Sequence, residues 1–256
     1  MSRRRVVKWI SLVVILLLVG AVVTLYLLSI ARPGDYRPLT LSAEQKARAI
    51  DQFEKRVSSF IADATKISSA EPGGTIDPDA RMEMAVTQDE LNEWVASLPD
   101  AAIAELRRIG LKDPSAAIGE GRLTFYAFWI RHERVLGVDL GFEFQDDGKM
   151  LVKLKGMRLG QMPVPVKIVN EFVHEMEGKV QDSLRQANQR EDGETFAGVP
   201  AKEFRAAAVA VLDALRGTPI EPVVRKPWAR VRIVDIKLAK ELMTLVAAPL
   251  TSELGS

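Results

Sequence analysis

The chain contains no cysteine, and its 256 residues include two histidines, His132 and His174. The absence of cysteine excludes disulfides, thiolate zinc sites, iron–sulfur clusters and thiol nucleophiles. Neither histidine has a second histidine at the spacing of metal ligands, and the HExxH pattern is absent. We therefore predict no metal site and no cofactor.

Catalytic motifs are absent as well. The sequence has no GxSxG, SxxK, P-loop or GxGxxG pattern, and Gly119-Glu120-Gly121 is a GxG fragment without the strand–loop–helix context of a dinucleotide site. His174 and Glu177 lie three residues apart on a predicted helix, so they can meet on its surface, and we expect a solvated or partner-bonded pair rather than a metal or acid–base site. We predict a non-enzymatic protein with no catalytic residues. A hydrolase would need a cleft with converging titratable groups.

The chain also lacks a large net charge, since its formal total is +1 at pH 7. Four of its 35 basic residues stand in the first nine positions, with no acid among them: Arg3, Arg4, Arg5 and Lys8. The rest of the chain then has 31 basic residues against 34 acidic ones. A weakly acidic body does not favour binding to DNA or RNA, which requires clustered Lys and Arg, so no nucleic-acid partner is predicted.

An uncharged apolar run extends from Trp9 to Ile30. As a helix it is roughly 33 Å long, enough to cross a hydrocarbon core of about 30 Å. The preceding basic cluster places the N-terminus in the cytoplasm by the positive-inside rule. A cleaved signal peptide is the alternative, because Ser29 and Ala31 are small residues at a cleavage spacing. The run exceeds a signal peptide's 7–15 apolar residues, so we predict a signal-anchor: a single-pass inner-membrane protein with a periplasmic C-terminal part.

Beyond the apolar run, the patterns predict helices and antiparallel strands. Ser42, with Gln45 at the capping-box position, begins an amphipathic helix of about 25 residues, whose apolar stripe we expect to pack on the domain rather than form a stalk. The period becomes two from about Ala116 to Leu159, which is typical of a β-meander, and Asp146-Asp147-Gly148 indicates a hairpin. Further elements are predicted as follows: a strand at Arg81–Val86, helices beginning at Thr87 and Asp100, a long amphipathic helix from Pro165 to Asn188, a helix at Phe204–Leu215, and strands at Ala229–Leu238 and Met243–Ala247.

The predicted fold class is α+β, with an N-terminal transmembrane helix followed by an antiparallel β-meander packed on long amphipathic helices. The predicted organisation has five parts: a cytoplasmic basic tip at 1–8, the transmembrane helix at 9–30, a juxtamembrane linker and amphipathic helix at 31–80, an extracytoplasmic domain at 81–250 and a flexible tail at 251–256.

Two segments carry a resemblance to a known family. Val86–Trp94 (Val-Thr-Gln-Asp-Glu-Leu-Asn-Glu-Trp) is a capped helix start, and Leu159–Pro165 (Leu-Gly-Gln-Met-Pro-Val-Pro) is a step from a strand into a long helix. Together with the intervening meander, roughly residues 82 to 190, they resemble the YpmS-like bacterial membrane-anchored proteins and, more distantly, the tubular lipid-binding families. The resemblance implies a curved antiparallel sheet wrapped around a long helix. It also implies binding of a lipid at the cell envelope, without catalysis.

The leading functional prediction is therefore binding of a lipid or other hydrophobic ligand between the sheet and the long helix. The alternative is a module with a dry core that scaffolds an envelope complex. The expected partners are the lipid bilayer, a lipid ligand and an envelope protein. The residues predicted to line the ligand site are Trp94, Phe125, Trp129, Phe142, Phe144, Phe172 and Met176.

Overall fold

The computed structural model of the chain describes residues 17, 20–21, 23–68, 81–189, 195–196, 199–200, 205, 209, 213, 216–226 and 229–249. After residue 42, the helices whose bounds the structure describes are α2 (Ala43–Ser68), α3 (Gln88–Ala96), α4 (Asp100–Arg108), the 3-10 turn η1 (Ile130–His132) and α5 (Val166–Asn188). The strands are β1 (Met82–Thr87), β2 (Leu111–Gly119), β3 (Arg122–Trp129), β4 (Arg134–Phe144), β5 (Met150–Leu159), β6 (Met162–Pro163), β7 (Thr195–Phe196), β8 (Val199–Pro200), β9 (Val223–Lys226), β10 (Ala229–Ala239) and β11 (Leu242–Pro249).

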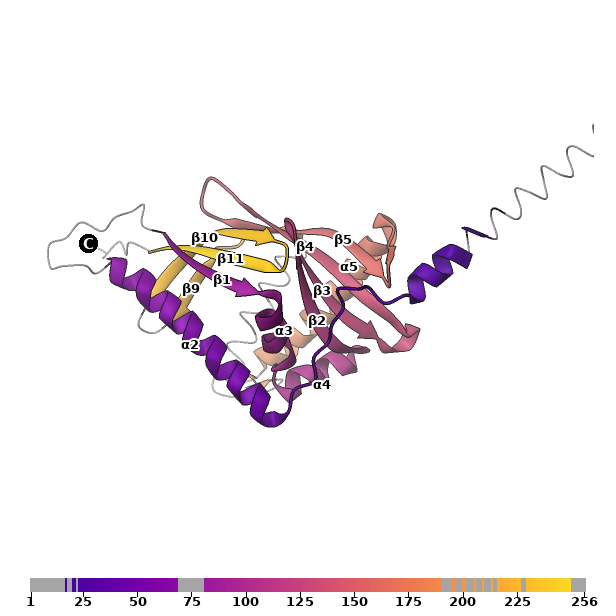
Figure 1. The fold of residues 1–256 in the computed structure, drawn as a ribbon, viewed down its shortest axis with the longest axis horizontal. Helices are drawn as coiled ribbons and strands as arrows, with labels where there is room; N and C mark the ends of the chain where they lie inside the picture. The colour runs from indigo at the N-terminus through magenta and orange to yellow at the C-terminus, as the bar shows by residue number, and fades with distance from the viewer. Residues whose placement is uncertain are drawn as a thin grey trace, which may run out of the picture.

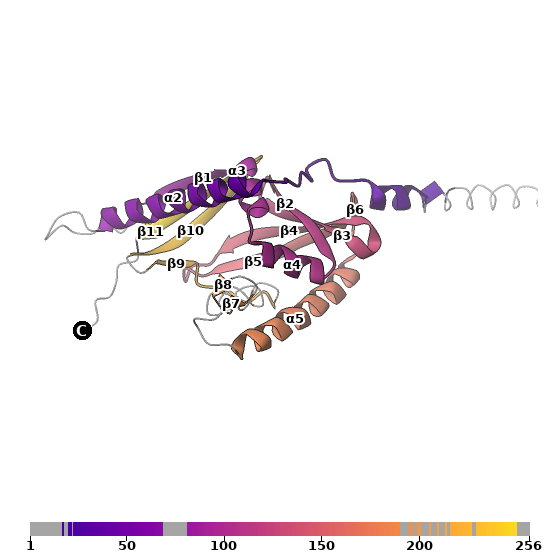
Figure 2. The same cartoon turned by 90° about the horizontal axis from the view of Figure 1, so that it is seen from below.

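The strands form two main antiparallel sheets, which confirms the α+β part of the predicted fold class (Figure 1). One sheet has the strand order β2-β3-β4-β5-β6 and is the predicted meander. The other has the order β1-β11-β10-β9, so β1 pairs with a strand from the far end of the chain. Figure 2 shows α2 and α5 on opposite sides of the two sheets.

The long helix α2 begins at the predicted capping box. The Ser42 N–H donates to Gln45 Oε1 at 2.8 Å, and the Gln45 N–H donates to Ser42 Oγ at 3.2 Å. Its apolar stripe packs on the domain as predicted, because Phe60, Ile61 and Ala64 are buried in the main core. That core also includes residues of α3 and of both sheets: Met84, Val86, Leu91, Val95, Ala116, Ile118, Leu123, Val231, Ile233 and Ala247.

The transmembrane prediction is corrected by the structure. No helix among the described residues is long and apolar enough to cross a membrane, which contradicts the predicted span at Trp9–Ile30, the signal-anchor and the single-pass inner-membrane location with a periplasmic domain. Residues 1–16, 18, 19 and 22 lie outside the described residues.

Two other predicted segments consist largely of residues that the structure does not describe. The helix at Phe204–Leu215 is described only at the helical positions 205, 209 and 213, and the tail at 251–256 is not described.

Helical residues 23–30 end against the turn between β5 and β6. The Gln161 N–H donates to the Leu28 carbonyl at 2.9 Å, so a carbonyl at the helix end has a partner. Gly160 has φ +61°, and a Cβ there would lie 2.4 Å from the Ser29 carbonyl oxygen and 2.7 Å from those of Leu28 and Ala31. Glycine at this position therefore permits the close approach of the helix end.

The outer edge of β2 is closed by two side-chain amides of α3. Asn92 Nδ2 donates to the Ala116 carbonyl at 2.8 Å, and the Ala116 N–H donates to Asn92 Oδ1 at 2.7 Å. The Ile118 N–H donates to Gln88 Oε1 at 2.9 Å, while the Ile118 carbonyl accepts the Glu241 N–H at 2.9 Å. We call this set of contacts the seam, because it joins the edge of the five-stranded sheet to α3 and to the β10–β11 turn.

The seam leads to a stability prediction. Asn92→Ala leaves the buried N–H and carbonyl of Ala116 without partners, so we expect the free energy of unfolding to fall by about 2–4 kcal/mol. Urea unfolding measures this change. Asn188→Ala, at an exposed position near the end of α5, is the control and should change stability by less than about 0.5 kcal/mol. Equal effects of the two substitutions would contradict the role of the seam.

The contact at Gly160 leads to a second prediction. Gly160→Ala places a methyl group against three carbonyl oxygens at a position with positive φ. We therefore expect the free energy of unfolding, measured by heat or urea, to fall by about 1–3 kcal/mol. We also expect faster proteolysis after Arg32 and Arg37, because the helix end separates from the turn. Gly178→Ala in α5 is the matched control: a Cβ there meets nothing within 4 Å, so this variant should gain about 0.5–1 kcal/mol.

Candidate functional site

One face of the five-stranded sheet carries most of the predicted ligand-lining residues. Phe125 on β3 is opposite Val138 on β4, and Leu123 is opposite Leu140, so these four side chains share a face. Strand alternation puts Trp129, Phe142 and Phe144 on the same face. The two-residue period predicted for these strands thus produces a continuous apolar surface.

This apolar face is covered at both ends. At one end, Phe142 and Phe144 pack against the main core, which contains Leu123. At the other end, Val169 of α5 is buried with Leu136 and Met157 in a separate cluster. Among the α5 side chains that the structure describes, Val169 and Val173 thus cover the face near the first turns of the helix.

The middle of the face is open to solvent. Phe125 is 37% exposed although β3 has a neighbouring strand on both sides, and Leu154 on β5 is 36% exposed. Val138, Leu140 and Val152 around them are half-buried. We call these five residues the open strip. Large apolar side chains on an inner strand are normally buried, so their exposure indicates a surface available to a partner or ligand.

Of the remaining predicted lining residues, Trp129 lies at the end of β3, whereas Phe172 and Met176 are only partly described. The Trp129 ring is half-buried, with its centroid 4.0 Å from that of His132. The backbones of Phe172 and Met176 lie in α5, and their side chains are outside the description.

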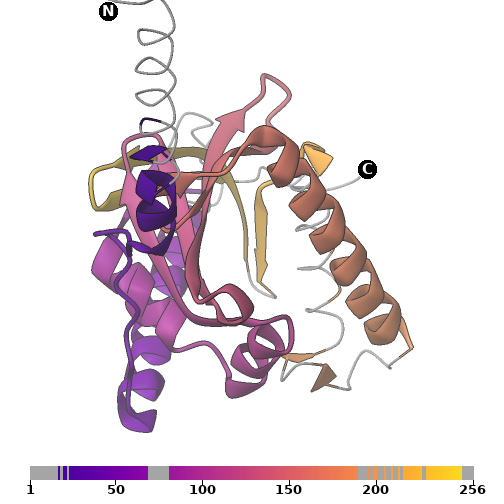
Figure 3. The same ribbon diagram turned by 90° about the vertical axis from the view of Figure 1, so that its right-hand side faces the viewer.

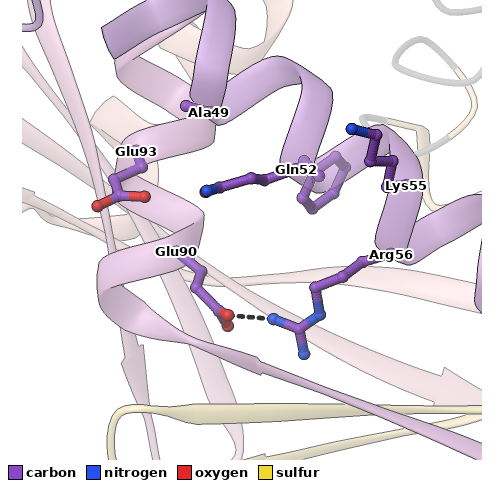
Figure 4. A pocket seen from close by; sticks show the side chains of 7 residues that line it. Ala49, Gln52, Lys55, Arg56, Glu90 and Glu93 are labelled. Carbon is purple, nitrogen blue, oxygen red and sulfur yellow. Dashed lines mark hydrogen bonds and ion pairs between the residues drawn. The ribbon is translucent and has the colours of Figure 1, made fainter.

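Trp94 lies in a different place, between α3 and α2. It is 36% exposed, and its ring packs on that of Phe53 with centroids 5.4 Å apart. Beside this pair is a hollow of about 290 Å³ (Figure 4), where Arg56 forms an ion pair with Glu90. Figure 4 also shows the side chains of Gln52 and Glu93 at the rim of the hollow. Packing on Phe53 explains why a tryptophan occupies this position.

The opposite face of the sheet, which we call the polar face, carries a small hydrophobic cluster that includes Ala117, Tyr126 and Val135. It also carries a buried ionic group that the sequence analysis did not identify. Asp139 is 8% exposed; it accepts a hydrogen bond from Thr124 Oγ1 at 2.7 Å and pairs with Arg158 Nη2 at 2.8 Å. These residues lie on three adjacent strands, so no local pattern relates them. Breaking such a pair leaves a buried charge, which is strongly destabilising.

Figure 3 shows the chain before α2 running beside the five-stranded sheet. Two tyrosines fix this segment to the polar face. The Tyr126 hydroxyl donates to both carboxylate oxygens of Asp35 at 2.9 Å, and the Tyr36 hydroxyl donates to the Asp113 carbonyl at 3.0 Å. Burial, the hydrogen bond to Asp35 and the Asp35 charge raise the pKa of Tyr126. Gly137 makes room for the Tyr126 ring, since a Cβ there would lie 2.6 Å from it. A glycine within a strand is the one sequence signal that could have indicated this contact.

The two histidines occupy surface positions. His132 is exposed in η1, and His174 Nδ1 lies 3.6 Å from Glu177 Oε2, which confirms that the pair meets on α5. Glu177 also accepts a hydrogen bond from Arg216 Nε at 2.5 Å. Within the described part of the chain, no three His, Asp or Glu side chains are grouped so that they could hold a metal ion.

Comparison with known proteins adds no relative: no protein-family model, curated protein sequence or solved structure matches this chain. The resemblance to YpmS-like and tubular lipid-binding proteins therefore stays a prediction.

The buried Tyr36 leads to a pH prediction. Burial and the charge of Asp113 raise the pKa of its hydroxyl from 10.0 to about 12. Because the folded state holds this proton more tightly, the stabilisation is complete below pH 10 and is lost as the pH rises towards 12. Tyrosinate absorbance should show a component with its midpoint near pH 12 that disappears in Tyr36→Phe. It should remain in Tyr26→Phe, whose ring is exposed. An unchanged titration in Tyr36→Phe would refute the assignment.

Proposed function

We propose that this protein holds a lipid acyl chain or another elongated hydrophobic molecule against the open strip. The observation that supports this function is Phe125, an aromatic side chain on an inner strand that is 37% exposed between two packed clusters. An occupant of the strip would complete the apolar layer between those clusters.

The chemistry of the strip favours an uncharged, flexible occupant. Its five residues are all apolar, and they extend across β3, β4 and β5, which corresponds to about 10 Å at a strand spacing of about 4.8 Å. Each methylene group removed from water contributes about 0.8 kcal/mol. An acyl chain that buries about five methylenes gains about 4 kcal/mol, which equals the lower estimates of the cost of association, so a longer buried stretch is needed for stable binding.

An interaction module with a dry core is the competing function. It requires that the open strip stay empty or be covered by a protein partner. The two functions differ in one observable property, which is whether a hydrophobic small molecule accompanies the purified chain.

The test uses mass spectrometry of lipids that co-purify with the full-length chain. We expect bound lipid above the level of a denatured control. We expect about fivefold less lipid in Phe125→Asn, because part of a phenylalanine contact is worth about 1 kcal/mol. Ile130→Asn is the matched control, since Ile130 is 43% exposed in η1 and is not part of the strip. Lipid at the denatured-control level, or equal losses in both variants, would refute the proposal.

A further inference from the structure

A second hollow lies on the polar face of the five-stranded sheet. Its volume is about 320 Å³, at the lower end of the range of about 300–1,000 Å³ for ligand pockets. Thr124 lines it, whereas the next residue, Phe125, belongs to the open strip on the other face. The hollow is therefore separate from the surface proposed to hold a hydrophobic molecule.

Three cationic side chains line this hollow: Arg37, Arg122 and Lys240. They come from the segment before α2, the start of β3 and the β10–β11 turn, so only the tertiary structure brings them together. None of the three makes a hydrogen bond or ion pair with another described side chain. Like charges that share a small hollow repel each other, and a bound anion removes that repulsion.

One bond of the seam and one neighbouring backbone bond set the positions of two of these cations, Arg122 and Lys240. The Glu241 N–H donates to the Ile118 carbonyl at 2.9 Å, and the Gly121 N–H donates to the Leu238 carbonyl at 3.0 Å. These two bonds hold the β2–β3 and β10–β11 turns side by side. Arg122 and Lys240 therefore extend from turns whose relative position is already set, which lowers the cost of gathering them around a ligand.

Two carboxylates also line the hollow, and they differ in what they contact. Asp35 accepts the Tyr126 hydroxyl on both of its oxygens. Glu241 makes no side-chain hydrogen bond or ion pair with another described residue, so its charge opposes an anion directly. Three cations against two carboxylates leave the hollow with a net positive charge.

We propose that this hollow is a binding site for a phosphate-type oxyanion, either inorganic phosphate or the phosphate of a phosphomonoester. The guanidinium groups of Arg37 and Arg122 supply planar pairs of donors, which match the oxygens of a phosphate, and Lys240 supplies a point charge. The volume exceeds that of one oxyanion, which leaves room for an organic substituent.

The experiment measures binding of inorganic phosphate, glycerol 3-phosphate and short-chain phosphatidic acid to the full-length chain by calorimetry at low ionic strength. We expect saturable binding that is about tenfold weaker in Arg122→Gln and in Lys240→Gln, the loss typical of one charge-assisted hydrogen bond. Glu241→Gln should bind several-fold more tightly, a gain that misfolding cannot produce. Affinity at least tenfold higher for phosphatidic acid identifies a lipid headgroup as the ligand, and similar affinities for all three identify the free oxyanion.

Arg131→Gln is the matched control, because Arg131 is an exposed arginine in η1 outside the hollow, and it should bind all three probes like the unmodified chain. Phe125→Asn should also leave phosphate binding unchanged, so failure of the hydrophobic site and failure of this one are distinguishable. The proposal is overturned if no probe binds saturably, if Arg131→Gln loses as much affinity as Arg122→Gln, or if Glu241→Gln does not bind more tightly.

Discussion

The hydrogen bonds of Gln88 and Asn92 to the edge of β2 are the constraint on which the arrangement of the two sheets depends. An edge strand presents unpaired N–H and carbonyl groups that would otherwise pair with water or with another chain. Two amide side chains one helical turn apart satisfy three of these groups, and the Glu241 backbone satisfies a fourth. The seam thereby closes one edge of the meander and fixes the β10–β11 turn beside it.

The two proposed sites follow from this arrangement and from the two faces of β3. Phe125 points to the face that is covered at its ends by the main core and by α5, which leaves the open strip between them. Thr124 points to the other face, where the segment before α2 and the two joined turns surround the cationic hollow. A single strand thus contributes to an apolar surface and to a polar one, because successive side chains of a strand alternate between faces.

The elements that depend on neighbouring residues were predictable from the sequence. The capping boxes at Ser42 and Thr87 rest on side chains three residues apart, and both are present in the structure. The turn at Asp146–Gly148 and the two-residue period of β3 and β4 also depend only on residues that are close together in the sequence. The transmembrane helix was wrongly predicted. The two segments that resemble a known family have structural roles here. Asn92 of the first hydrogen-bonds the edge of β2, and Gly160 of the second leaves room for the end of the helix at residues 23–30.

The sequence by itself determined the identity and the inner face of most helices and strands, because periodicity and capping act over a few residues. Only the tertiary structure decided that β1 pairs with β11, that Tyr126 holds Asp35, and that Arg37, Arg122 and Lys240 share one hollow. It also decided which apolar residues remain exposed: the sequence marks Phe125 and Phe142 alike, yet one is open to solvent and the other packs against the main core. Such differences depend on which distant elements cover each part of a face, and a local pattern carries no information about that.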